Sequence, residues 1–179
     1  EALSLKFYTH ASPTYYNAGS EKKQYASCFL LGTRDSREGI MRTADHISEI
    51  SKYSGGIGVH INCLRGAGAK IRGTNGRSSG IVPWLKIYNE VMKGFNQGGR
   101  RPGSAAFYIM PHHPDIMKFI EITRNGGTEE MRARAIFTSL WIPDIFMERV
   151  RDGALWSTFD PDTCGDLSDY TGEEYLKKY

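Results

Sequence analysis

The chain has 179 residues, of which 23 are Lys or Arg and 20 are Asp or Glu, so its formal net charge is +3. A charge this close to neutral gives no support for binding to nucleic acid or to an anionic membrane, and any bound anion must meet a local site. No stretch reaches the roughly 20 apolar residues that a membrane span needs, and the start does not resemble a signal peptide. The length suits one globular unit with a core of its own.

Three cysteines, Cys28, Cys63 and Cys164, are scattered along the chain. Their spacing fits neither a disulfide framework nor the paired C-x-x-C pattern of a zinc site, which favours a reducing compartment. The sequence begins at Glu1 without Met and stops on a charged stretch, residues 173–179. Our expectation for its origin is therefore a fragment or one piece of a split chain.

Apolar residues at helical spacing predict a helix over residues 38–52, which a glycine run ends. Residues 57–63 alternate between larger apolar residues and small or polar ones, a pattern typical of a strand. Residues 66–80 are polar and rich in glycine, and loops of that length are usually functional or disordered. A helix is predicted next over residues 81–95, with Pro83 in the first turn, where proline is tolerated.

In the second half, residues 104–110 predict a buried strand and residues 114–122 a helix that begins with proline. The apolar run that ends residues 134–142 predicts a further strand, and residues 143–150 a last helix. We interpret residues 156–159 as one more strand. Strands that alternate with helices indicate an α/β unit with mostly parallel strands, in which ligands bind beyond the carboxyl ends of the strands.

Cys28 stands just ahead of an apolar, strand-like run. From the residues alone, the commoner explanation is a small buried side chain, because free cysteine is among the most buried residue types. The alternative is a redox thiol at the edge of a strand, with the Ser27 hydroxyl offered to a ligand. Cys63 and Cys164 are interpreted as structural.

Glycine clusters interleaved with cations run from residue 54 to residue 77. Glycines let the backbone approach a ligand closely, and backbone N–H groups with cationic side chains at this density suit a phosphate-bearing ligand. Neither G-x-G-x-x-G nor G-x-x-x-x-G-K-[ST] occurs, so plain turns remain the alternative. The cations are Lys52, Arg65, Lys70, Arg72 and Arg77.

Residues 97–103 carry three glycines, one proline and two arginines. One interpretation is a solvated turn. The other is a loop that changes conformation when a ligand binds, with its arginines reaching a base or a phosphate.

The adjacent His112 and His113 raise the question of a metal site. Neighbouring histidines on a strand point to opposite faces, and no Cys or Glu partner stands at metal-like spacing. We therefore expect no metal site in this chain.

Eight short strings, spread over the chain, carry a further signal. They are residues 12–19 (SPTYYNAG), 27–31 (SCFLL), 54–58 (SGGIG), 73–76 (GTNG), 97–103 (QGGRRPG), 114–116 (PDI), 132–134 (RAR) and 140–144 (LWIPD). In this order and at this spacing, they resemble the large, catalytic subunit of class I ribonucleotide reductase.

The resemblance implies that residues 1–179 form a single unit, the first part of the ten-stranded α/β barrel of these reductases. We find no counterpart of the family's amino-terminal activity domain, of the finger-loop half with its radical cysteine, or of the carboxyl-terminal pair of shuttle cysteines. This chain alone is therefore expected to be catalytically incomplete.

The activity implied is that of a ribonucleoside-diphosphate reductase, an oxidoreductase that makes deoxyribonucleotides for DNA replication by thiol and thiyl radical chemistry. Deoxynucleoside triphosphates and ATP are the implied allosteric effectors. The chain is expected to bind no cofactor itself, because the radical comes from a di-metal small subunit. The other implied partners are a ribonucleoside diphosphate, the second half of the large subunit and a second large subunit in a homodimer, all in the cytoplasm.

Cys28 matches the family cysteine that reduces the substrate and is oxidised to a disulfide with a second cysteine farther along. Removing the 2′-hydroxyl of a ribonucleotide takes two electrons and a proton, which a pair of thiols supplies. Cys63 and Cys164 do not stand where the second cysteine should. The substrate contacts implied by the resemblance are Ser12, Thr14, Ser27 and Gly56.

The resemblance also implies an allosteric specificity site, which reads a deoxynucleoside triphosphate across a dimer interface. The residues that match its base and ribose end are Asp35, Ser36 and Arg37. Those that match the remaining contacts, chiefly to phosphate, are Lys52, Arg65, Ile71, Arg72 and Gly73. The specificity loop that relays effector identity to the substrate base would comprise Gln97, Gly98, Gly99, Arg100 and Arg101.

Two alternatives remain open beside this interpretation. The chain could be a non-catalytic nucleotide-binding or split-subunit scaffold piece that has kept the fold without the reaction. It could also come from a cobalamin-dependent reductase of the same barrel, in which the thiol chemistry is unchanged and the radical source differs.

Overall fold

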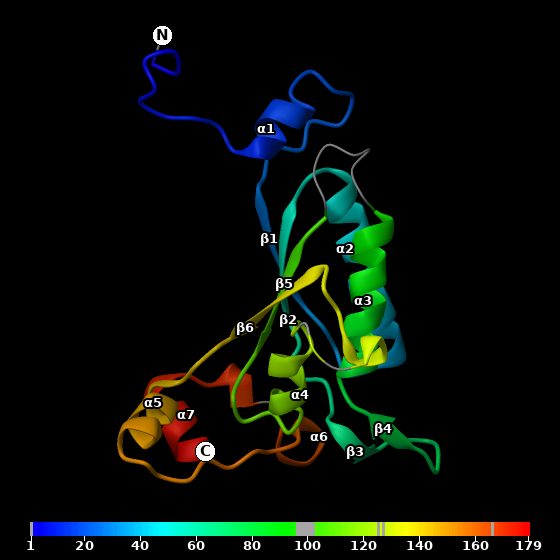
Figure 1. The fold of residues 1–179 in the computed structure, drawn as a ribbon, viewed down its shortest axis with the longest axis vertical. Coiled ribbons are helices and arrows are strands. Elements are labelled where there is room, and N and C mark those ends of the chain that lie inside the picture. The colour runs from blue at the N-terminus through cyan, green and yellow to red at the C-terminus, as the bar shows by residue number, and fades with distance from the viewer. Residues whose placement is uncertain (1, 96–102, 125, 127, 166) are drawn as a thin grey trace.

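A computed structural model describes residues 2–95, 103–124, 126, 128–165 and 167–179 of the chain (Figure 1). At its centre is a four-stranded sheet in which all neighbouring strands are parallel. In spatial order, the strands are β1 (Cys28–Gly32), β2 (Gly56–His60), β5 (Ala105–Ile109) and β6 (Ile136–Leu140). The prediction of an α/β unit with parallel strands is confirmed.

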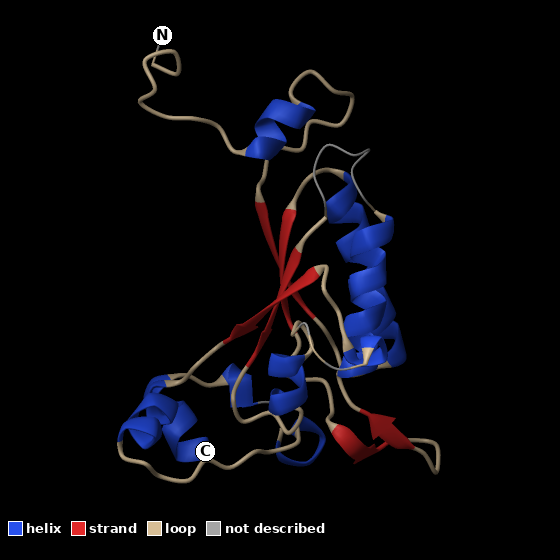
Figure 2. Cartoon of the chain, viewed as in Figure 1, coloured by secondary structure: helices blue, strands red, loops and turns tan. Residues whose placement is uncertain are grey.

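Two long helices, α2 (Arg37–Lys52) and α3 (Val82–Gly94), cover one face of the sheet (Figures 1 and 2). Alternate residues of the central strands point into this layer, and Val59 of β2 and Phe107 of β5 are fully buried there. Tyr88 of α3 stacks on Phe107, with ring centroids 5.5 Å apart. The main core therefore lies between the sheet and these two helices.

The sequence of α2 explains where this helix begins and which face it buries. The Ser36 Oγ accepts a hydrogen bond from the Gly39 N–H at 3.0 Å, which satisfies one amide group of the first turn. Ile40, Ala44 and Ile47 follow at helical spacing, and all three are buried. The helix predicted over residues 38–52 is thereby confirmed.

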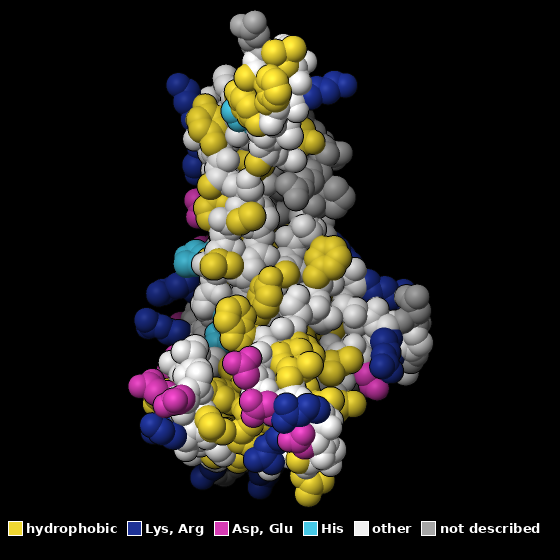
Figure 3. All heavy atoms as spheres, turned by 90° about the vertical axis from the view of Figure 1, so that its left-hand side faces the viewer, with side chains coloured by type: hydrophobic (Ala, Val, Ile, Leu, Met, Phe, Trp, Pro, Cys, Tyr) yellow, Lys and Arg dark blue, Asp and Glu magenta, His cyan; other side chains and the backbone are white. Residues whose placement is uncertain are grey.

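The opposite face of the sheet leaves large apolar side chains exposed. Leu30 of β1 is 87% exposed and Phe137 of β6 is 63% exposed. Figure 3 views the molecule from the side away from α2 and α3, and hydrophobic side chains gather along it. A concavity of about 410 Å³ lies on this face, between Leu30, Tyr108 and Trp141. Because parallel sheets are normally covered on both faces, we expect further protein to cover this one.

Residues 66–80, which the sequence predicts as a long loop, contain a two-stranded antiparallel hairpin. Its strands are β3 (Ala67–Lys70) and β4 (Arg77–Ser79). The prediction was wrong because these strands are short and polar, and they lack the apolar alternation by which a strand is recognised.

Two carboxylates from distant parts of the chain hold the base of this hairpin. Asp115 Oδ2 accepts hydrogen bonds from the backbone N–H groups of Ala67, at 3.0 Å, and Ile81, at 3.2 Å. Asp160 Oδ2 accepts one from the Gly66 N–H at 3.0 Å. Only 3% of Asp115 is exposed, so water and salt screen its charge-assisted bonds very little. The two aspartates therefore fix where the hairpin leaves the core.

The other described helices are short. They are α1 (Ser12–Asn17), α4 (Ile116–Glu121), η1 (Glu129–Met131), α5 (Asp144–Arg151), α6 (Pro161–Cys164), η2 (Leu167–Asp169) and α7 (Gly172–Lys178). Of these, α4 and α5 correspond to the last two helices predicted from the sequence. In the described part of the chain, no helix is both long enough and apolar enough to cross a membrane.

Residues 156–159, interpreted from the sequence as a strand, form no strand. Trp156 stacks on Tyr179 with ring centroids 4.4 Å apart, and Phe159 meets the same ring edge-on at 5.5 Å. The interpretation was wrong because these aromatic side chains pack on the residue that follows α7 instead of entering a ladder of strands.

Replacing Gly80 by Ala tests whether the hydrogen bonds accepted by Asp115 hold the hairpin in place. An added Cβ would lie 2.2 Å from Asp115 Oδ2, and Gly80 has a φ of +83°. Gly68→Ala is the matched control, because its φ is +88° and its Cβ would meet nothing within 4 Å. We expect Gly68→Ala to lower the free energy of unfolding by about 1 kcal/mol, and Gly80→Ala by about 3 kcal/mol because it also displaces a buried carboxylate. Equal losses in urea denaturation would show that Asp115 does not hold the hairpin.

Candidate functional site

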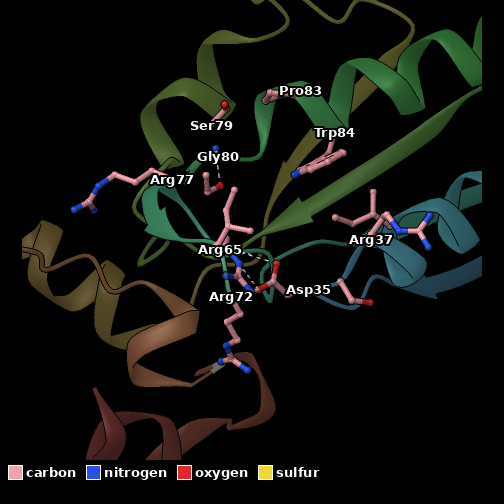
Figure 4. A pocket seen from close by; sticks show the side chains of 13 residues that line it. Asp35, Arg37, Arg65, Arg72, Arg77, Ser79, Gly80, Pro83 and Trp84 are labelled. Carbon is pink, nitrogen blue, oxygen red and sulfur yellow. Dashed lines mark hydrogen bonds and ion pairs between the residues drawn. The ribbon is translucent and has the colours of Figure 1, made fainter. Parts of the chain in front are cut away.

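A pocket of about 610 Å³ lies between the start of α2, the β3–β4 hairpin and the start of α3 (Figure 4). We call it the hairpin pocket. It lies beyond the carboxyl end of β1, the sheet edge at which parallel α/β folds bind ligands. Its lining residues are Asp35, Ser36, Arg37, Ile40, Arg65, Ile71, Arg72, Arg77, Ser78, Ser79, Gly80, Pro83 and Trp84.

Arg65 is firmly held at the centre of this pocket, where it faces Asp35 (Figure 4). Its Nη2 and Nε atoms lie 2.7 and 2.8 Å from Asp35 Oδ2, and its Nη1 donates to the Lys70 carbonyl. The hydrogen bond to Asp35 raises the pKa of Arg65 above its ordinary value, although burial of the guanidinium acts in the opposite direction. Arg65 is thus a permanent positive charge in a fixed orientation.

A second carboxylate, Asp162 of α6, also faces the pocket arginines. Its Oδ1 lies 3.0 Å from Arg72 Nη2 and 3.7 Å from Arg65 Nη2. The side chain of Asp162 is 15% exposed, whereas that of Arg72 is 80% exposed. Arg72 is therefore accessible to a ligand while it is held by an acid that does not itself line the pocket.

The wall of the hairpin pocket combines positive charge with an apolar surface. Four arginines and one aspartate line it, so the wall is net cationic. Trp84, Ile40 and Pro83 supply the apolar part. Guanidinium groups bind phosphate oxygens through paired hydrogen bonds, and aromatic rings stack on flat groups. The pocket therefore suits a ligand that has an anionic end and a flat, less polar end.

Most residues that the sequence predicts for effector binding meet in this pocket. Those that line it are Asp35, Ser36, Arg37, Arg65, Ile71 and Arg72. Gly73 follows Arg72 in the turn of the hairpin. Lys52 is not brought there, because it ends the 16-residue α2, about 22 Å along the helix from Arg37. A ligand in the hairpin pocket cannot meet the Lys52 of the same chain.

Part of the pocket wall was missed in the sequence. The missed residues are Ile40, Ser78, Ser79, Gly80, Pro83 and Trp84. One usable signal was Trp84, which stands in the first turn of a helix that directly follows a polar, glycine-rich run. That position puts its ring at the same sheet edge as the run.

Cys28 lies at the opposite edge of the sheet, where the parallel strands have their amino ends. It is the first residue of β1, is exposed, and pairs in register with Gly56 of β2. The Gly56 N–H donates to the Ser27 carbonyl at 2.7 Å, and a Cβ on Gly56 would lie 3.0 Å from the same oxygen. Of the two explanations for Cys28, the buried side chain is wrong for this structure, and the accessible thiol is the one left to test.

Helix α1 lies at the same edge, where β1 begins (Figure 1). Asn17 Nδ2 donates to the carbonyls of Gln24, at 2.7 Å, and Tyr53, at 3.0 Å, which ties α1 to the approach to β1 and to the turn before β2. Ser12 is exposed and Thr14 is half-buried on this helix. The predicted substrate residues therefore share one sheet edge with the thiol.

The other two cysteines lie elsewhere. Cys63 follows the carboxyl end of β2, and its Sγ donates to the Thr33 carbonyl. Cys164 is exposed at the end of α6. Neither stands at the edge where Cys28 begins β1.

One predicted segment lies outside the described residues, namely the specificity loop Gln97, Gly98, Gly99, Arg100 and Arg101. This stretch of sequence connects the end of α3, at Gly94, to the start of β5, at Ala105. Because β1, β2 and β5 are parallel, β5 starts at the same sheet edge as Cys28.

The adjacent histidines are buried and hydrogen-bonded. A ring nitrogen of His113 lies 2.7 Å from the Leu64 carbonyl, and one of His112 lies 2.9 Å from the Tyr175 hydroxyl. Among the described residues, no three His, Cys, Asp or Glu side chains are grouped so as to hold a metal ion. His112 therefore ties α7 to the segment that follows β5, and His113 ties that segment to the loop after β2.

Comparison with known proteins places the chain among enzymes of one kind. The family model described as "Ribonucleotide reductase, barrel domain" matches residues 26–179. The ribonucleoside-diphosphate reductase large chain of Cryptosporidium parvum is 47% identical over 181 aligned positions, which cover 100% of this chain and 22% of that protein. The large subunit of Danio rerio is 49% identical over 99% of this chain and 22% of its own length.

The large subunit of Vaccinia virus (strain Copenhagen) is 48% identical over 99% of this chain and 23% of its own length. The chain thus spans less than a quarter of each of these relatives. The match to the family model nevertheless covers every strand of the parallel sheet and the whole hairpin pocket. The chain belongs to the ribonucleotide reductase family.

Proposed function

We propose that this chain is the first part of the catalytic barrel of a ribonucleoside-diphosphate reductase large subunit. The relatives that carry this name are 47% to 49% identical to it. The observation that carries the proposal is the pair of sites at opposite edges of one sheet, an exposed thiol at Cys28 and a cationic pocket at the hairpin. The first suits reduction of a substrate, and the second suits a regulatory nucleotide.

Cys28 supplies one of the two thiols that the reaction consumes. Overall, a ribonucleoside diphosphate and two thiols give a deoxyribonucleoside diphosphate, water and a disulfide. Each thiol loses one hydrogen atom, the 2′-oxygen leaves as water, and the sulfurs join. The second thiol comes from residues beyond this chain, and a small subunit supplies the radical that starts the reaction.

Substrate binds at the edge that holds Cys28. Ser12 and Thr14 of α1 and the Ser27 hydroxyl are the polar groups proposed to contact it, and Gly56 leaves its backbone accessible. The absence of a side chain at Gly56 matters, because a Cβ there would press on the Ser27 carbonyl at 3.0 Å. This crowding supports a role for Gly56 in shaping the substrate site.

The hairpin pocket binds the deoxynucleoside triphosphate or ATP effector. Arg65 and Arg72 bind phosphate oxygens, while Asp35, Ser36 and Arg37 contact the ribose and base. Lys52 contributes from a second large subunit across the dimer interface, because the length of α2 keeps it away from the pocket of its own chain. The enzyme so proposed is cytoplasmic.

The two long helices connect the sites. Both α2 and α3 begin at the hairpin pocket and end at the sheet edge of Cys28, and they pack together on the core. Residues 97–101 follow the end of α3, at Gly94, after two further residues in the sequence. We propose that this loop, Gln97 to Arg101, carries effector identity to the substrate, through a helix that runs from the hairpin pocket toward the sheet edge of Cys28.

Replacing Cys28 by Ser in the full-length large subunit, assayed with its small subunit, tests the thiol. Serine keeps the shape but cannot form a disulfide, so turnover of ribonucleoside diphosphates is expected to fall on the order of 10³-fold. Cys164→Ser is the matched control, because Cys164 is equally a free, exposed thiol. Turnover by Cys28→Ser at the rate of the control would rule out the assignment. A wild-type protein that binds nucleotide but never turns over would favour the non-catalytic alternative.

Replacing Arg72 by Gln tests the effector pocket. Its side chain is 80% exposed, so its loss should leave folding intact while it removes a charged partner of the triphosphate. Calorimetry with thymidine triphosphate should show binding weakened about 10-fold. Arg151→Gln is the control, because Arg151 is also an exposed, ion-paired arginine but lies on α5, away from the pocket. If both variants bind thymidine triphosphate like the wild type, the effector is bound elsewhere.

A further inference from the structure

Asp162 places a negative charge beside two arginines with which the hairpin pocket would bind an anion. It lies on α6, 90 positions after Arg72 in the sequence, and it is not among the residues that line the pocket. One oxygen, Oδ1, faces both Arg72, at 3.0 Å, and Arg65, at 3.7 Å. These are the two arginines assigned above to the effector phosphates.

The position of Asp162 is fixed by the fold. Asp160 Oδ1 accepts a hydrogen bond from the Asp162 N–H at 2.9 Å, and Asp160 Oδ2 accepts one from Gly66 at the base of the hairpin, at 3.0 Å. A Cβ on Gly66 would lie 2.4 Å from Pro114 Cγ and 3.1 Å from Asp160 Oδ2. The start of α6 is therefore packed against the hairpin base, and the Asp162 carboxylate is held beside the arginines.

The two arginines differ in how firmly they depend on Asp162. Arg65 has Asp35 as a partner at 2.7 Å and is mostly buried, so it stays in place whatever Asp162 does. Arg72 is mostly exposed, and its Nη2 donates to Asp162 at 3.0 Å. A triphosphate near these arginines would be repelled by the Asp162 carboxylate and would compete with it for Arg72.

We propose that Asp162 is an internal counter-anion of the hairpin pocket, which pairs with Arg72 and Arg65 and yields Arg72 to phosphate oxygens when a nucleoside triphosphate binds. This inference rests on the proposed effector site and adds a residue that sets its affinity. Asp162 keeps Arg72 near the pocket, at the cost of weaker phosphate binding.

The test is Asp162→Asn in the full-length large subunit, with binding of thymidine triphosphate measured by calorimetry. Asparagine keeps the size of the side chain and one oxygen but removes the charge. Exposed and partly exposed ion pairs are weak, so we expect binding to tighten about 5-fold at low salt and less at high salt. Asp152→Asn is the matched control, because Asp152 is also an ion-paired aspartate but lies just after α5. That control should leave the affinity unchanged.

A double-mutant cycle separates this role from a merely structural one. If Asp162 acts on phosphate through Arg72, the tightening caused by Asp162→Asn should shrink to about 2-fold in an Arg72→Gln background. If Asp162 had only a structural role, its replacement would instead weaken binding of the triphosphate, with or without Arg72. Asp162→Ser, which removes the same charge near a helix start, repeats the test if the Asn variant folds poorly.

The outcomes are distinct. If the wild-type protein does not bind the triphosphate, the proposed effector pocket itself is wrong. If the wild type binds and both Asp162 variants bind equally well or more weakly, the counter-anion proposal is overturned and the effector pocket stands. Tighter binding that does not depend on Arg72 would likewise overturn it.

Discussion

The hairpin pocket depends on two carboxylates, the buried Asp115 and the half-buried Asp160, that fasten a polar hairpin to the core. Asp115 binds the amides of Ala67 and Ile81, and Asp160 binds the amide of Gly66, so both ends of the hairpin are fixed. The hairpin has little apolar surface to bury, and charge-assisted hydrogen bonds replace the packing that it lacks. Since the hairpin carries Arg72, its position decides where a cationic wall meets the start of α2. The stability of the hairpin and the shape of the proposed effector pocket thus depend on the same two carboxylates.

A second constraint is the parallel sheet, which separates two kinds of chemistry. All carboxyl ends lie at the edge that faces the hairpin, and all amino ends lie at the edge where Cys28 begins β1. The thiol therefore lies apart from the pocket cations. The two helices that cover the sheet run between these edges. A shift of α3 at Trp84 would therefore also displace the other end of the helix, near Gly94. This arrangement gives the proposed allosteric control a physical route.

The sequence predicts the parts of this fold that local patterns encode, and it fails where distant residues decide. The apolar spacing of α2 and α3 was sufficient for both helices, because each buries one continuous stripe. The hairpin was missed because its anchors, Asp115 and Asp160, lie 48 and 94 positions from the amides they bind. In the pocket, Arg65, Arg72 and Arg77 were predicted from their density among glycines, and Arg37 from the family resemblance. Trp84 was missed because a tryptophan in a helical pattern is usually part of the core.

The decisive measurement is a structure of the full-length large subunit bound to thymidine triphosphate. We expect a triphosphate in the hairpin pocket, with phosphate oxygens on Arg65 and Arg72 and with Arg72 released from Asp162. A neighbouring concavity lined by Arg34 and Arg42 offers another cationic surface near the start of α2. A triphosphate bound there, with the ion pair between Arg72 and Asp162 intact, would show that the hairpin pocket is not the effector site.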